Sequence, residues 1–124
     1  MAEPGTVIGW KLDRAQRAAL LDRFKPQYAR PDADHVTLAT NAAAQALPPP
    51  CQASIVGHVD DRVGLEAMVV EIDGSTDRPD GSTFHITWSL DEGRRARESN
   101  EVLKDRGWKP LDSPIPIQVE PARF

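Results

Sequence analysis

One pattern, His-x-Thr, occurs twice in the chain, and each copy lies in a run that alternates polar and apolar residues. The first copy is His35-Val36-Thr37 and the second is His85-Ile86-Thr87. Because side chains alternate between the two faces of a β-strand, the histidine and the threonine of each copy share one face. The opposite face carries apolar side chains, namely Val36 and Leu38 in the first run and Phe84, Ile86 and Trp88 in the second. The sequence therefore predicts two strands, each with a buried apolar face and a polar face that is free to line a cleft.

The rest of the chain reads as short elements separated by glycine- and proline-rich loops. Strands are predicted over 6–12 and 114–120, a hairpin over 52–59 and 63–72, and helices over 14–25 and 94–106. Asp13 is a suitable N-cap for the first helix, and Gly107 a suitable C-terminal stop for the second. The two prolines of the last strand favour a sheet edge. This order predicts an α+β domain in which two helices pack on the outer faces of a curved antiparallel sheet.

Length and charge exclude several kinds of protein. The chain has 124 residues, which is the size of one domain, so residues 1–124 are expected to form a single monomeric unit. A net charge of −4 argues against electrostatic binding of long duplex nucleic acid, which needs many contacts to phosphates. The single cysteine, Cys51, cannot form an internal disulfide, so a cytoplasmic setting is the default. No signal peptide or membrane-spanning segment is expected, because the chain starts without a basic and apolar leader.

Two imidazoles and two hydroxyls on facing strands suit acid–base chemistry on a phosphate. Histidine has an ordinary pKa near 6.5, so one ring can act as a base while the other acts as an acid at neutral pH. The hydroxyls of Thr37 and Thr87 can donate hydrogen bonds to non-bridging phosphate oxygens. The alternative is structural: two strand histidines hydrogen-bonded on a solvated sheet face, with no chemistry.

The tetrapeptides His35-Val36-Thr37-Leu38 and His85-Ile86-Thr87-Trp88 resemble the signatures of the 2H phosphoesterase superfamily. The resemblance implies a bilobal α+β fold with a central cleft lined by two His-x-Thr strands. It implies His35 and His85 as catalytic residues, with His85 as base and His35 as acid, and Thr37 and Thr87 as phosphate ligands. The implied activity is hydrolysis of cyclic phosphates without a metal or cofactor. This chain is more compact than larger members, because no substantial helix precedes the second motif.

Several functions remain open at this stage. The leading one is a cyclic phosphodiesterase of RNA processing that opens a 2′,3′-cyclic phosphate at an RNA 3′ end or on a nucleotide. Cyclic oligonucleotides, 2′–5′ linkages and a cyclic phosphate of ADP-ribose are alternative substrates. A nucleotide-binding module without turnover and a purely structural domain are the alternatives from other classes. The partner expected in the leading case is the cyclic-phosphate nucleotide or RNA end, with no long duplex and no membrane.

Other polar residues are weaker candidates for the site. Tyr28 is a candidate to stack on a nucleobase, Ser89 is predicted to extend the polar face of the second strand, and Arg78 is a possible phosphate contact. The dense basic segment 94–97 could contact a flanking phosphate of a nucleotide, but it is expected to be a solvated helix start. His58 has no partner motif and is expected to be structural.

Neither a metal centre nor a catalytic thiolate is indicated by the sequence. The histidines and Cys51 do not have the spacing of a metal site. Cys51 also lacks the basic neighbours that would favour its thiolate form.

Overall fold

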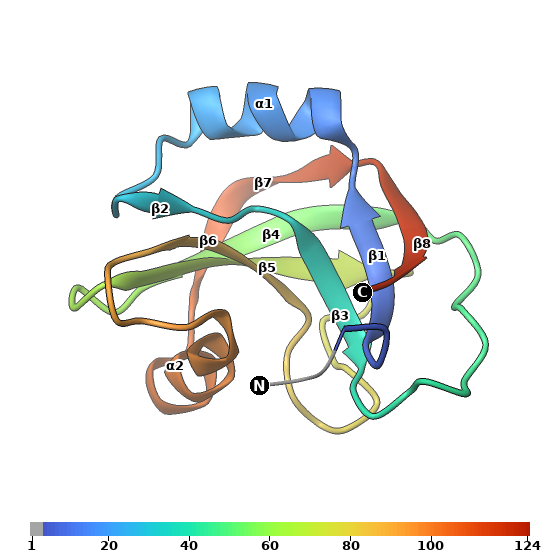
Figure 1. Ribbon diagram of the computed structural model, residues 1–124. Coiled ribbons are helices and arrows are strands. Elements are labelled where there is room, and N and C mark those ends of the chain that lie inside the picture. The colour runs from blue at the N-terminus through green and yellow to red at the C-terminus, as the bar shows by residue number, and fades with distance from the viewer. Residues whose placement is uncertain (1–3) are drawn as a thin grey trace.

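Strands outnumber helices in the computed structural model, which describes residues 4–124 (Figure 1). In chain order the elements are β1 (Ile8–Leu12), α1 (Arg14–Arg23), β2 (Arg30–Pro31), β3 (His35–Ala39), β4 (Ala53–Asp60), β5 (Leu65–Ile72), β6 (His85–Leu90), a 3₁₀ turn η1 (Ala96–Glu98), α2 (Ser99–Arg106), β7 (Lys109–Ile117) and β8 (Val119–Arg123). The fold is therefore α+β, as the sequence predicts.

The strands form two antiparallel sheets rather than the one curved sheet that was expected. The smaller sheet has the order β3-β1-β8, and the larger has the order β2-β6-β5-β4-β7. The last predicted strand is divided at Gln118 into β7 and β8, and each of these lies at the edge of a different sheet. The chain end thus leaves one sheet for the other. The prediction of an edge position for the proline-rich strand is confirmed.

Two apolar clusters hold the layers together. The larger cluster joins both sheets and α1, and it includes Trp10, Val36, Met68 and Trp88. The smaller cluster lies on the other face of β5 and β6, where α2 packs through Val102 and Leu103. Figure 1 shows the two helices on opposite sides of the molecule, with the strands between them.

The helix ends follow from local chemistry. The carboxylate of Asp13 accepts a hydrogen bond from the backbone N–H of Gln16 (2.9 Å), which caps α1 as predicted. The second helix begins later than predicted, because residues 96–98 form the 3₁₀ turn before α2. Gly107 ends α2 with a φ of 68°, a value that glycine adopts without strain.

A short segment crosses from the larger sheet to the smaller one and so brings β3 beside β6. The backbone N–H groups of Asp32 and Ala33 donate to the carbonyls of Trp88 and Thr87, both at 2.8 Å. Ala33 is buried and has a φ of 49°, which turns the chain away from β6. The following residues then pair with β1 as strand β3. This crossing places the first motif strand next to the second.

Two arginines of α1 fix the crossing segment. Arg17 donates to the carbonyl of Asp32 at 2.7 Å and to that of Ala33 at 3.1 Å. Arg14 donates to the carboxylate of Asp34 at 2.9 Å and to its carbonyl at the same distance. The arginines lie three residues apart and so share a helix face. Helix α1 therefore positions the residue that immediately precedes His35.

Over the described part of the chain, 4–124, neither helix has the length and apolar character that crossing a bilayer requires. The first three residues, where the expectation about a leader also applies, lie outside the described residues.

Candidate functional site

The two His-x-Thr motifs meet at one cleft. The cleft has a volume of about 480 Å³, and its lining includes His35 and Thr37 from β3 together with His85 and Thr87 from β6. These strands belong to different sheets, so the cleft is lined by both. The structure thus brings together the four residues that the motifs single out.

His85 is held in one orientation at the buried side of the cleft. Its residue is only 8% exposed, and Nδ1 lies 2.8 Å from the carbonyl oxygen of Thr83. Because a carbonyl only accepts, Nδ1 carries the proton and Nε2 is left with the lone pair in the neutral ring. Burial lowers the pKa of His85 to about 4, and the positive charges of Arg78 and His35 add to this, while the bond to Thr83 acts in the opposite direction. The ring is therefore neutral at pH 7.

His35 is more accessible than His85, and one of its ring nitrogens is paired with a carboxylate. Its Nδ1 lies 2.9 Å from Oδ2 of Asp34, and its side chain is 30% exposed. Desolvation raises the pKa of Asp34, but hydrogen bonds from His35 and Arg14 outweigh this, so the net shift of that pKa is downward. The ring of Phe124 lies against His35, with 4.2 Å between ring centroids. The pairing with an ionised carboxylate orients Nδ1 away from any ligand and leaves Nε2 for the cleft.

The two threonines differ in how far their hydroxyls are engaged. Among residues 4–124 nothing hydrogen-bonds the Thr37 hydroxyl, which is half-buried in the cleft wall. The Thr87 hydroxyl is buried and lies 2.8 Å from Oγ of Ser99 and 3.3 Å from the carbonyl of Ala96. Thr37 is therefore free to donate to a ligand at once. Before Thr87 can donate to a ligand, its hydroxyl must give up the long hydrogen bond to the carbonyl of Ala96.

Arg78 reaches the cleft, as the sequence suggested. Its guanidinium is 8% exposed and donates to Oγ of Ser82 (2.7 Å), Oδ1 of Asn100 (2.7 Å) and the carbonyl of Thr37 (3.3 Å). Asp80 lies at 3.4 Å as a more distant ion-pair partner. A buried cation held at three points is a fixed source of positive charge beside both motifs.

The cleft is also lined by residues that were not among the predicted site residues. Arg97 and Asn100, from the start of the second helical region, line it, as do Asp32 and Phe124. Burial raises the pKa of Asp32, against the opposing effect of the nearby His35. A signal was present for Arg97, since the basic segment follows the second motif strand. Its neighbours Arg94 and Arg95 do not line the cleft, and Arg94 instead pairs with Asp61 at 2.7 Å.

Ser89 does not lie in the cleft, contrary to the prediction. Thr87 pairs with Ala67 of β5 whereas Ser89 pairs with the preceding residue, Glu66, so a β-bulge at Trp88 shifts the register. The bulge reverses which face the next side chain occupies. Ser89 is fully buried and its hydroxyl donates to the carboxylate of Glu66 at 2.7 Å.

Tyr28 also lies elsewhere, contrary to the prediction. Its hydroxyl donates to the carboxylate of Asp60 at 2.5 Å, and its backbone N–H to Oγ of Ser89 at 3.3 Å. Both partners belong to the far end of the larger sheet, so the loop after α1 carries the ring away from the motifs. Tyr28 lines a different cavity.

Two residues behave as the sequence indicated. His58 is hydrogen-bonded, with Nε2 at 2.9 Å from the buried carboxylate of Glu66. Desolvation by burial, with a contribution from Asp73, raises the pKa of Cys51 to about 11, so its thiolate is not favoured. No three His, Cys, Asp or Glu side chains between residues 4 and 124 are grouped as ligands for a metal ion.

The motifs and their geometry are the basis for any assignment of family. Comparison with protein-family models, curated proteins and solved structures gives no match. The resemblance to the 2H phosphoesterases is therefore an expectation from the two tetrapeptides.

The buried state of His85 predicts how stability depends on pH. Its pKa is about 4 in the folded protein against 6.5 as the ordinary value, so between these values the unfolded chain binds more protons. The free energy of unfolding therefore falls as pH drops from about 6.5 to about 4, by about 3 kcal/mol from this residue. His85→Gln, compared with wild type by urea unfolding at several pH values, should have the flatter profile. Equal slopes for the two proteins would show that His85 is not buried in the neutral form.

Proposed function

We propose that the chain is a metal-independent phosphodiesterase that opens a 2′,3′-cyclic phosphate at an RNA 3′ end or on a nucleotide. One observation carries the proposal: His35, Thr37, His85 and Thr87 all line a single cleft although they come from two sheets. Two strand histidines on a solvated face, the structural alternative, would have no reason to converge. The two sheets on either side of the cleft would be the two lobes of a bilobal 2H phosphoesterase fold.

The hydrogen bonds favour His85 as the base and His35 as the acid. The Nδ1–H of His85 is donated to Thr83, so its Nε2 is an acceptor that faces the reaction as a base. In the imidazolium form of His35, Nδ1–H is donated to Asp34, which leaves Nε2–H as the proton for a leaving group. The two rings thus have complementary roles without any rearrangement.

The proposed reaction is an in-line hydrolysis. Water loses a proton to Nε2 of His85 while its oxygen forms a bond to phosphorus. The bond from phosphorus to one ribose oxygen breaks, and that oxygen receives the proton from Nε2 of His35. The product is a phosphomonoester with a free neighbouring hydroxyl, and the two histidines then exchange protons with solvent to return to their starting forms.

Charge in the transition state would be stabilised by the hydroxyls and by Arg78. Thr37 can donate directly to a non-bridging oxygen, and Thr87 can do so after releasing Ala96. The guanidinium of Arg78 is fixed by Ser82 and Asn100 before any ligand arrives, so it stabilises developing negative charge without reorganising. Arg97 adds a second cation at the rim.

The proposal is tested by hydrolysis of a panel of substrates in EDTA. The panel contains the four 2′,3′-cyclic nucleotides, a short RNA that ends in a cyclic phosphate, a 2′–5′-linked dinucleotide and a cyclic dinucleotide. We expect turnover of the first two kinds by wild type, and turnover at least about 10²-fold slower by the double variant His35→Ala/His85→Ala. Turnover of only the last two kinds would support the alternative substrates. Binding of all of them without turnover would contradict the proposal and favour a nucleotide-binding module.

A further inference from the structure

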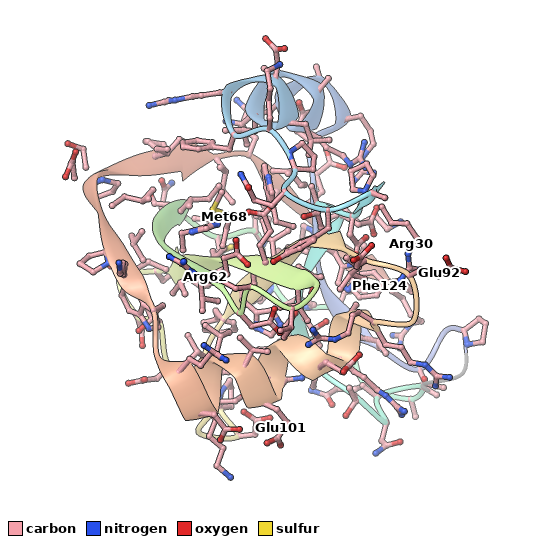
Figure 2. The ribbon with its side chains drawn as sticks, turned by 90° about the vertical axis from the view of Figure 1, so that its left-hand side faces the viewer. Arg30, Arg62, Met68, Glu92, Glu101 and Phe124 are labelled. Carbon is pink, nitrogen blue, oxygen red and sulfur yellow. The ribbon has the colours of Figure 1, made fainter. Side chains whose placement is uncertain are left out.

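A second and larger cavity lies at the other end of α2. Residues at the start of the helical region line the motif cleft, whereas Arg106 and Gly107 at the helix end line this second cavity of about 760 Å³. The tip of the β4–β5 hairpin contributes Arg62. Lys109 is the first residue of β7, and Trp108 immediately precedes it. Figure 2 shows Arg62 well apart from Phe124, which marks the motif cleft. The proposed phosphodiesterase chemistry makes no use of this cavity.

Three cations in the lining have no partner for their charge. Within residues 4–124 the side chains of Arg62, Arg106 and Lys109 make no ion pair or hydrogen bond, and all three are exposed. Asp60 is the one carboxylate in the lining, and its Oδ1 already accepts from the Tyr28 hydroxyl and from the backbone N–H of Arg62. The lining therefore carries an excess of positive charge in a chain whose net charge is −4. Such a local excess attracts anions.

An exposed tryptophan lies among these cations. Trp108 is 36% exposed, which is unusual for so large an apolar side chain. Its ring packs over Gly57, where a Cβ atom would come within 2.1 Å of the indole. The absence of a side chain at Gly57 thus leaves room for the six-membered ring of Trp108 against β4, and Trp108 also lines the cavity. An exposed aromatic side chain that lines a cavity suits stacking by a planar ring.

We infer that this cavity is a binding site for a nucleoside phosphate, with the base stacked on Trp108 and the phosphates held by Arg62, Arg106 and Lys109. Inorganic anions alone would use the cations but not the indole, and a neutral aromatic compound would use the indole but not the cations. The nucleoside phosphate is the ligand class that uses both. The site is independent of the motif cleft and does not require the proposed phosphodiesterase activity.

The inference is tested by titrating the ¹⁵N-labelled protein with adenosine 5′-diphosphate, pyrophosphate and adenosine separately. We expect saturable shifts of the Trp108 indole N–H and the Gly107 amide with adenosine 5′-diphosphate, and weaker binding of the two partial ligands. Arg106→Ala/Lys109→Ala should weaken the nucleotide by at least about tenfold, because charge-assisted hydrogen bonds are lost. Trp108→Leu should weaken the nucleotide but leave pyrophosphate unchanged.

Lys104→Ala is the matched control, since Lys104 is a cation of the same helix that lines neither cavity. It should bind adenosine 5′-diphosphate as wild type does. If Lys104→Ala weakens the binding of adenosine 5′-diphosphate as much as Arg106→Ala/Lys109→Ala does, the weakening reflects the net charge of the protein and not this cavity. That result would overturn the inference. Shifts confined to residues around His35 and His85 would also overturn it, without affecting the proposed function. Amide spectra that overlay on wild type will establish that each variant is folded.

Discussion

His85→Ala is expected to lower kcat/KM for a 2′,3′-cyclic nucleotide by about 10²–10⁴-fold, the range for loss of a positioned general base. The reason is geometric. The Nδ1–H of His85 is tied to the carbonyl of Thr83, so Nε2 is the basic atom, and no other imidazole occupies that wall of the cleft in residues 4–124. Initial rates for wild type and variant, measured in EDTA on protein with a native circular dichroism spectrum, check the expectation.

Two comparisons distinguish loss of catalysis from general damage. Ser89→Ala alters the same strand, but the Ser89 side chain is turned away from the cleft toward Glu66, so this variant should keep wild-type kcat/KM. His35→Ala should lose activity to a similar degree, and the double histidine variant should lose little more, because paired groups acting in one step are not additive. Full activity of either single histidine variant would contradict the paired mechanism.

The assignment of His85 as the base also predicts where the acid limb of the pH profile of kcat/KM lies. The burial of His85 lowers its pKa to about 4, so kcat/KM of the free enzyme should hold down to nearly that pH before the base is protonated. An acid limb at pH 6 to 7 would mean that His85 is not the base.

Local patterns predicted the elements and the direction of their faces. Alternation identified Val36 and Trp88 as buried core, and both are fully buried. The cap at Asp13 and the stop at Gly107 depend only on neighbouring backbone groups, and both were predicted correctly. These features follow from interactions within a few residues, which a single sequence contains.

The wrong predictions depend on partners that are remote in the chain. The bulge that turns Ser89 away arises from the register between β6 and β5, and no pattern within β6 reveals it. Tyr28 is held by Asp60, thirty-two residues later. The polar face of β6 was predicted to line a cleft, but its depth of burial was not predicted: His85 is 8% exposed and Thr87 is 7% exposed. This burial, rather than the motif itself, lowers the pKa of His85. Asp34 adjoins His35, yet its ionised state depends on Arg14 of α1.

Gly9 of β1 lies closer to the backbone of a neighbouring strand than any other glycine of the chain, and that strand is β3. It pairs with Thr37, and a Cβ atom at Gly9 would lie 2.0 Å from the carbonyl oxygen of Val36 and 3.0 Å from the backbone nitrogen of Leu38. These obstructing atoms are backbone of β3, so a side chain here cannot be accommodated by a rotamer change. Strands β1 and β3 must separate, and β3 carries His35 and Thr37.

Gly9→Ala should therefore lower both stability and activity. Overpacking against backbone is expected to reduce the free energy of unfolding by about 3 kcal/mol, measured by urea unfolding at pH 7. A shift of the first motif strand by even about 1 Å can cost about 10²-fold in rate, so kcat/KM should fall in the fraction that remains folded.

Gly74→Ala is the matched control, because Gly74 has a φ of 89° and no atom within 4 Å of its virtual Cβ. It should cost only about 1 kcal/mol of backbone strain and leave hydrolysis unchanged, since Gly74 itself does not line the cleft. A Gly9→Ala protein as stable and active as Gly74→Ala would mean that β1 and β3 do not approach so closely. The position of His35 would then have to be maintained by Arg14, Arg17 and the crossing segment alone.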